Sequence, residues 1–295
     1  MKKTMLYLAA AGFMFASCQK DEETTATNGV GAKASTTSSV SPLPGSFTKK
    51  VLIEELTGQN EGTAPYADRF FDSYVLNTAG GKICVASLYN SGQLTNLETN
   101  RLISTLSPGT ASLPCGVIDR VPRNGSMFVR PTSMSQAVTS SLATPVSCGL
   151  AMTSTISGRM ATINVHTGFL ANMTSSYRVN VYLIEDVVSS SSPIFAQANS
   201  YNSTVGSPYY NLGNPILNYV HRNVVRKVVS PTGGDPILPA NTVAGGTQVF
   251  TYQVDLNQKV TTGSKFYVIS FITDNLTSEV LNVQMGQLGG LTDWN

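Results

Sequence analysis

The pattern of hydrophobic and polar positions changes near Thr144-Pro145. Before this point, short apolar runs alternate with segments in which apolar residues recur every three or four positions, as in strands alternating with helices. After it, apolar and polar residues alternate with period two between turns rich in Gly, Pro, Asn and Ser, which is typical of half-buried strands. The pattern predicts two domains, at residues 47–144 and 145–295.

The first domain is predicted to have the element order β-α-β-α-β-β-α. The expected strands are Val51–Leu56, Lys82–Leu88, Gly116–Val121 and Met127–Val129, and the expected helices begin at Pro65 and at two capping boxes, Thr95-x-x-Glu98 and Ser133-x-x-Gln136. Strands that alternate with helices favour an α/β domain.

The second domain is predicted to be an antiparallel β-sandwich without a helix. The expected strands are Met160–Thr167, Tyr177–Ile184, Tyr219–Val228, Gln248–Leu256, Phe266–Thr273 and Val280–Met285. The fold class is therefore expected to be multidomain α+β, with an α/β domain followed by a sandwich.

The first residues have the order of a secretion signal. Two lysines precede the uncharged apolar run Met5–Phe15, which is followed by small residues and Cys18. This run is much shorter than the roughly 20 apolar residues of a membrane-spanning helix, so we expect residues 1–17 to be cleaved. Phe15-Ala16-Ser17-Cys18 resembles the bacterial lipobox, in which the cysteine is acylated. The alternative is a plain secreted protein with a chance cysteine.

Residues 18–46 are predicted to form a flexible, lipidated tether. They are rich in Thr, Ser, Gly and Ala and too poor in apolar residues to pack. The run Gln19–Glu23 resembles the short acidic signal that sends Bacteroidota lipoproteins to the outer face of the outer membrane, although a solvated charge cluster would look the same. We therefore expect a lipid-anchored protein of the outer membrane that faces the cell exterior.

Amino-acid composition limits the kinds of partner that the chain can bind. Charged residues make up 12% of the chain, about half of the roughly 25% that is usual in soluble proteins. The formal net charge is +2, which gives no basic field of the kind that binds nucleic acid. Nucleic acid is therefore not an expected partner.

The cysteines and histidines offer little chemistry. Cys84 lies in an apolar run and is expected to be buried, whereas Cys115 and Cys148 have more polar neighbours and are the plausible disulfide, although sequence cannot fix connectivity. His166 and His221 fall on separate predicted strands without further ligands at metal-binding spacing. No metal or cofactor is expected.

Four stretches resemble one family. They are Lys50–Gln59 with Pro65 six positions later, Leu113–Arg120 in the family's Pro-x-Gly-x-x-x-Arg form, Val181–Asp186, and Tyr219–Arg226. They are similar to segments of the Bacteroidota outer-membrane lipoproteins named after a 28-kilodalton outer-membrane protein. The resemblance implies a thioredoxin-like domain followed by an immunoglobulin-like β domain.

The resemblance also implies a degenerate redox site. Many relatives carry Cys-x-x-Cys-Pro at the start of the first helix, and these two cysteine positions fall here on Glu61 and Ala64, before Pro65. Pro114 matches the cis-proline that faces the active site. Without the cysteine pair, thiol exchange by the usual thioredoxin mechanism is not expected.

Two functions follow from these features. The first is a non-enzymatic binding or structural module, held to the membrane by its lipid, with an unknown protein or glycan ligand. The alternative is an envelope disulfide handler or chaperone that uses Cys115 with Cys84 or Cys148. The number of accessible thiols distinguishes them, because the second function needs a reactive thiolate.

Overall fold

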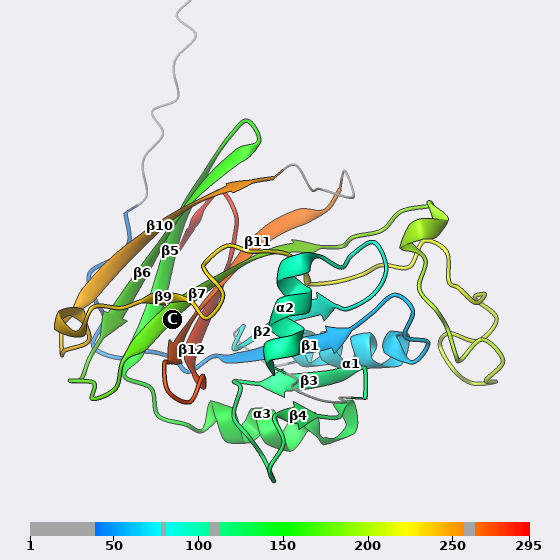
Figure 1. Cartoon of the computed structure of the whole chain (residues 1–295), viewed down its shortest axis with the longest axis horizontal. Helices are drawn as coiled ribbons and strands as arrows, with labels where there is room; N and C mark the ends of the chain where they lie inside the picture. The colour runs from blue at the N-terminus through cyan, green and yellow to red at the C-terminus, as the bar shows by residue number, and fades with distance from the viewer. Residues whose placement is uncertain (1–38, 78–80, 107–111, 257–262) are drawn as a thin grey trace, which may run out of the picture. The chain divides into compact units, whose positions relative to one another are not determined.

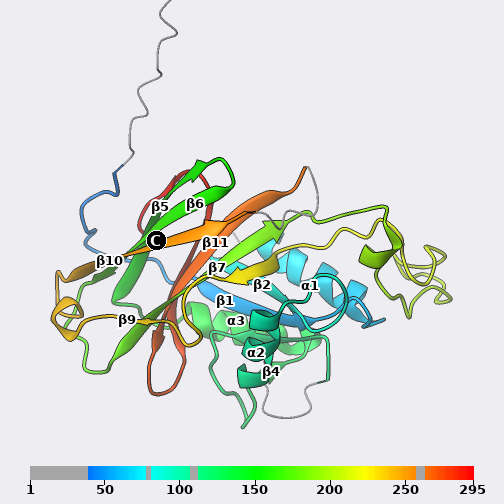
Figure 2. The same cartoon turned by 45° about the horizontal axis from the view of Figure 1, so that its top comes forward.

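Two β-sheets carry the fold in the computed structural model, which describes residues 39–77, 81–106, 112–256 and 263–295 (Figures 1 and 2). Contacts group Ser38–Asn295 into one compact unit. The signal segment, Cys18 and the first part of the predicted tether lie outside the described residues. No helix in the described part of the chain is long and apolar enough to cross a membrane.

The larger sheet has nine strands in the order β12-β11-β7-β8-β2-β1-β3-β4, with β9 paired to β7. Its strands are β1 (Val51–Thr57), β2 (Ile83–Tyr89), β3 (Cys115–Ile118), β4 (Phe128–Val129), β7 (Tyr177–Asp186), β8 (Val224–Val228), β9 (Asp235–Pro236), β11 (Lys265–Asp274) and β12 (Val280–Gln287). Strands from before and after Thr144 thus share one sheet, joined where β8 lies parallel to β2.

The smaller sheet has four strands in the order β10-β6-β5-β13. They are β5 (Cys148–Ser157), β6 (Met160–Phe169), β10 (Thr247–Asp255) and β13 (Leu291–Thr292). Their inner side chains, such as Ile163 of β6, form one hydrophobic core with residues of the larger sheet. These include Val181 of β7 and Ile272 of β11. The structure is a mixed α+β fold in which strands predominate, and the boundary at Thr144-Pro145 stays a prediction.

Three α-helices cover the two faces of the β1–β2–β3 part of the sheet. They are α1 (Ala64–Asn77), α2 (Leu97–Leu106) and α3 (Met134–Leu142), and the 3₁₀ turns are η1 (Pro131–Ser133), η2 (Pro193–Phe195) and η3 (Pro239–Asn241). Phe71 of α1 and Met134 of α3 pack in one core cluster, and Leu102 of α2 packs in another. Both faces need a cover because alternate side chains of β1 point to opposite faces of the sheet and all of them are buried.

The elements differ from the sequence expectation at two helix caps and one strand start, and the strands β5, β9 and β13 were not expected. Asn96, not Thr95, caps α2: its Oδ1 accepts from Thr99 N at 2.8 Å, and Thr99 Oγ1 accepts from Asn96 N at 3.2 Å. Ser133 precedes α3 without a side-chain capping bond. The strand expected from Tyr219 begins only at Val224, because Asn223 has a φ of 51°.

The predicted flexible tether ends earlier than expected. Within residues 39–46, Leu43 lies against Gly168, and just beyond them Phe47 lies against Gly149, where any added Cβ would come within 2.3 Å of these side chains. The indole Nε1 of Trp294 donates to Ser41 O at 2.8 Å. The expectation that residues 18–46 are too poor in apolar groups to pack is therefore wrong for this part, because glycines of the small sheet make room for the few that are there.

Candidate functional site

The start of α1 brings the predicted degenerate redox residues together. Ala64 is fully buried, and Glu61 caps the turn through its carbonyl, which accepts from Ala64 N at 3.0 Å. The Leu113-Pro114 bond is cis, as the resemblance implied. Pro114 lines a pocket of about 260 Å³ together with Tyr66 of α1 and with Arg130 and Tyr201. Neither Glu61 nor Ala64 lines this pocket.

The described cysteines are poor candidates for thiol chemistry. Cys84, Cys115 and Cys148 are free and buried, and burial raises the pKa of each thiol to about 12. They therefore stay protonated near neutral pH. The expected disulfide between Cys115 and Cys148 is wrong, since the two residues belong to different hydrophobic clusters, one around β1 to β3 and one inside the sandwich.

A long irregular segment between β7 and β8 covers the turn before α1. We call residues Val187–His221 the platform loop; in Figures 1 and 2 it extends beyond α1, from the green to the yellow part of the chain. Its base closes where Val188 pairs with His221. The loop backbone joins the turn through Ala198 N to Gln59 O and Ser200 N to Gly62 O, both at 2.8 Å.

Side-chain amides hold the platform loop where no regular ladder does. The fully buried Gln197 donates through Nε2 to Gly58 O and Glu61 O at 3.2 and 3.0 Å. Asn199, also buried, donates to Tyr209 O and Gly213 O at 2.9 Å each. Buried backbone groups need such partners, because an unpaired one costs about 1–3 kcal/mol. The loop is thus ordered from within.

Two carboxyl groups sit under the platform loop. Glu55 of β1 is buried and accepts from Ser87 Oγ at 2.6 Å, while Asp68 of α1 accepts from Tyr219 of the loop at 2.9 Å. Burial first, and then the charge of Asp68, raise the pKa of Glu55 well above its ordinary value. Burial raises the pKa of Asp68 to about 6. Of the two carboxyl groups, Asp68 is thus the one that ionises near pH 6.

His221 is a structural residue. It is fully buried, and its Nε2 donates to Phe195 O at 2.9 Å, which leaves Nδ1 to accept from Tyr89 Oη at 3.0 Å. Burial lowers its pKa to about 4, so it is neutral at physiological pH. His166 lies on β6, away from this site, and no group of metal-ligating side chains occurs among the described residues.

The outer surface of the platform loop is uncharged and carries many apolar side chains. No Asp, Glu, Lys or Arg occurs from Val187 to His221. Large hydrophobic side chains are nevertheless exposed here, with relative exposures between 38 and 81%: Val187, Ile194, Val205, Tyr210, Leu212, Leu217 and Val220. Apolar surface gathered on one structured loop is typical of an interaction site.

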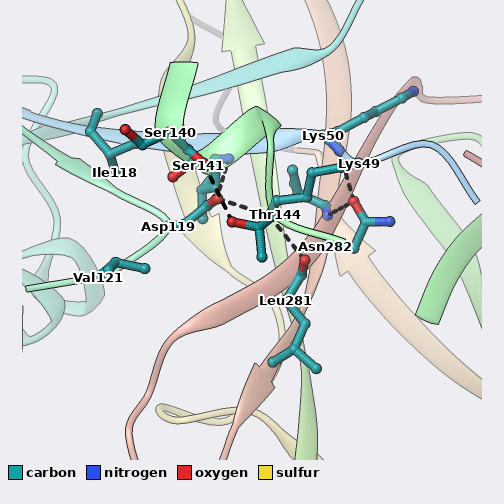
Figure 3. Close-up of polar contacts among 12 residues, drawn as sticks. Lys49, Lys50, Ile118, Asp119, Val121, Ser140, Ser141, Thr144, Leu281 and Asn282 are labelled. Carbon is teal, nitrogen blue, oxygen red and sulfur yellow. Dashed lines mark hydrogen bonds and ion pairs between the residues drawn. The ribbon is translucent and has the colours of Figure 1, made fainter. Parts of the chain in front are cut away.

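A second irregular segment, after β3, holds buried charges (Figure 3). Asp119 and Arg120 both have positive φ, 48° and 54°. Asp119 forms an ion pair with Lys49 at 2.8 Å and accepts from Leu52 N, and Lys49 also donates to Leu281 O. These contacts tie β1 and β3 to β12, whose Leu281 and Asn282 appear in the same view.

Arg120 extends this cluster into the sandwich. Its guanidinium donates to both carboxylate oxygens of the buried Glu54, at 2.7 and 2.8 Å, and to Tyr182 Oη at 2.9 Å. Its Cζ lies 5.1 Å from the ring centre of Phe271. We call Lys49, Glu54, Asp119, Arg120 and Tyr182 the junction network. Four of its five residues, all but Lys49, lie in the stretches that carry the family resemblance.

These features define a class: a mixed α+β chain with a helix start that carries no thiol and a sandwich joined to it through one sheet. The family model described as "Outer membrane protein Omp28" matches residues 106–290, which is more than half of the chain. The chain therefore belongs to the Omp28 family of outer membrane proteins, as the sequence resemblance indicated.

A solved structure supports the fold. The chain is similar to HBP35 of Porphyromonas gingivalis, with a TM-score of 0.62 and 14% sequence identity, over 83% of this chain and 77% of that one. At this identity the likeness concerns the fold alone. No curated protein matches the chain.

No direct signal in the sequence marks the platform loop or the junction network as a site. Absence of charge between Asp186 and Arg222, with repeated Asn, Ser and Tyr, was the available sign of the loop. For the network, Lys49, Glu54 and Asp119 are charged residues in or beside apolar strands, where an unpaired charge is rarely tolerated.

Proposed function

We propose that this chain is a non-enzymatic binding module of the outer membrane. Acylated Cys18 anchors it, the chain faces the cell exterior, and the platform loop presents the binding surface to a protein or glycan. Residues 47–144 act as a thioredoxin-like domain without its redox pair, and residues 145–295 as an immunoglobulin-like sandwich. The element order after β1 and the cis bond before Pro114 support the first assignment.

One observation carries this proposal: hydrogen bonds hold the platform loop on its inner side, and apolar side chains are exposed on its outer side. Gln197 ties the loop to the turn before α1 and Asn199 satisfies backbone carbonyls of the loop, while Leu212 and Leu217 are 53 and 54% exposed. The loop is rich in Tyr, Ser and Asn, residues that are enriched in antibody paratopes, where they combine contact area with adaptable hydrogen bonds. A pre-ordered surface loses less conformational entropy when it binds.

The position of the loop suits a membrane-anchored binder. In Figures 1 and 2 the segment that begins at residue 39 runs beside the small sheet, whereas the platform loop lies at the opposite end of the described unit. The described chain therefore begins at the end away from the loop.

Thiol chemistry has less support. The three described thiols are buried, with pKa values raised to about 12 by burial, whereas reactive cysteines are exposed and have lowered pKa values. Glu61 and Ala64 supply no replacement nucleophile.

Position-specific photo-crosslinking in intact cells tests the proposal. A photoreactive residue at Leu212 should give a discrete adduct, whereas one at Ile156, which is 50% exposed on β5, should not. Leu217→Ser should weaken the Leu212 adduct without lowering the amount of protein in the membrane. No adduct from Leu212, or the same adduct from Ile156, would contradict a binding role for the loop.

The anchor is tested separately. Cys18→Ala should release the chain from the membrane fraction, because the acyl chains provide the membrane affinity. Continued membrane association would contradict lipid anchoring and leave the loop experiment unaffected.

A further inference from the structure

Four strands form the edges of the two sheets, and three of these edges are closed to other chains. β4 and β13 have only two residues each. β12 is covered by the segment before β1, in which Lys50 N donates to Asn282 Oδ1 at 2.9 Å and Asn282 Nδ2 donates to Thr48 O at 3.2 Å. Short strands, covering segments and lysines are the usual protection of a sheet edge.

The fourth edge, β10, has none of these protections. It pairs with β6 over all nine residues without a bulge, and no described strand pairs with its other side. Thr247–Val254 contains neither a charged residue nor a proline. The 3₁₀ turn η3 reaches only the beginning of the strand, through the side chain of Gln248. A long, uncharged edge strand is a template for pairing with another strand.

We propose that β10 pairs with β10 of a second copy of this chain, antiparallel and with its two-fold axis at Thr251. The two small sheets then form one continuous sheet across a symmetric dimer. The partner is a second copy because the strand is complementary to itself in this register: Phe250 lies opposite Tyr252, and Val249 opposite Gln253.

Side-chain chemistry favours this register. Phe250 and Tyr252 lie on the inner face and are only half-buried in the monomer, so pairing them covers apolar area that the sandwich core leaves open. Aromatic cross-strand pairs stabilise antiparallel pairing. Asp255, the one charge of the strand, lies opposite Thr247, and no like charges meet.

Cysteine crosslinking in intact cells tests the pairing. Opposed residues of antiparallel strands have Cα atoms about 4.5–5.5 Å apart, within the range of a disulfide. Thr251→Cys in the full chain should therefore give a covalent dimer with a mild oxidant. Unsubstituted chain should not, because Cys84, Cys115 and Cys148 are buried. Thr155→Cys is the matched control, since Thr155 is exposed on β5 of the same sheet.

Mass measurement of the detergent-purified full chain provides the second arm. The unsubstituted chain should sediment as a dimer, and Thr251→Lys, which places two ammonium groups at the two-fold axis, should sediment as a monomer with an unchanged circular dichroism spectrum. The proposal requires both results. It is overturned if Thr251→Cys crosslinks no better than Thr155→Cys, if the unsubstituted chain is a monomer, or if Thr251→Lys stays dimeric.

Discussion

The backbone is irregular both in the platform loop and in the segment after β3 that carries Asp119 and Arg120 of the junction network. The two regions are nevertheless stabilised in opposite ways. The junction network is made of buried charges, in which Arg120 meets Glu54 at 2.7 Å and Lys49 meets Asp119 at 2.8 Å. The platform loop has no charge, and the amides of Gln197 and Asn199 hold it instead.

This difference separates a structural region from a binding region. Buried ion pairs need an accurate geometry. Each ion loses its free energy of hydration on burial, and only its hydrogen bonds and its attraction to the partner offset that loss. They fix how the sandwich joins the first strands. A neutral loop whose backbone is held by side-chain amides leaves its outer side chains free to contact a partner, with no charge to desolvate on binding.

The largest expected effect is on the junction network. Arg120→Ala leaves Glu54 buried without its partner, and should lower the free energy of unfolding by about 3–5 kcal/mol. Arg159→Ala is the control, since it removes an ion pair with Asp255 that is 2.6 Å long but exposed, which is worth at most about 1 kcal/mol. Chemical denaturation measures both. Equal losses would contradict a special role for the buried pair.

A smaller and local effect is expected in the platform loop. Asn199→Ala removes the donors to Tyr209 O and Gly213 O, which should cost the loop about 1–3 kcal/mol. Limited proteolysis should then cut within Val187–His221 about tenfold faster or more.

The global unfolding midpoint of this variant should change little, because the side-chain bonds of Asn199 to Tyr209 O and Gly213 O lie within the loop. Gln136→Ala, an exposed amide on α3, is the matched control and should leave the cleavage rate unchanged. A loss of global stability in Asn199→Ala as large as that of Arg120→Ala would remove the distinction between the two regions.

Periodicity identified most of the regular elements, and its failures have physical reasons. β5 was missed because its sequence, CGLAMTSTIS, mixes small and polar residues without clear alternation. Thr95 and Asn96 are both good caps, so the start of α2 was placed one residue early. Leu43 and Phe47 pack although their neighbours in the sequence are mostly polar, because they lie against glycines that are far away in the chain.

The candidate site was predictable only in part. The cis bond at Pro114 and the loss of the cysteine pair at Glu61 and Ala64 came from the resemblance, and the burial of Cys84 from its apolar neighbours. The cysteine pairing was wrong because two polar contexts say nothing about distance. Contacts between Gln197 and the turn before α1 join residues more than a hundred positions apart, and no local pattern encodes them.

The acidic pair under the loop predicts a pH dependence. The pKa of Asp68 is about 6 in the folded chain and near 3.8 ordinarily, so its contribution to stability is present below pH 4 and is lost as the pH rises through 6. Asp68→Asn should remove about 1 kcal/mol of the stability difference between pH 4.5 and 7.5, a value reduced for solvent screening of this half-buried group. Denaturation at both pH values measures it, and an unchanged difference would contradict the assignment.

The smallest expected effect is in thiol reactivity. Cys115, in the core cluster that contains Leu102 of α2, and Cys148, in the sandwich, should both resist a soluble thiol reagent in the folded chain and react only on unfolding. Single Cys→Ser variants assign the signal. Rapid reaction of Cys115 alone would show that this core opens, and would revive the thiol-dependent alternative.

Hydrogen exchange of the free protein tests the central claim most directly, namely that the platform loop is ordered before it meets a partner. The backbone amides of Ala198 and Ser200 donate to the turn before α1. These amides should exchange at least about a hundredfold more slowly than in an unstructured peptide. Exchange at the unstructured rate would contradict a preformed binding surface.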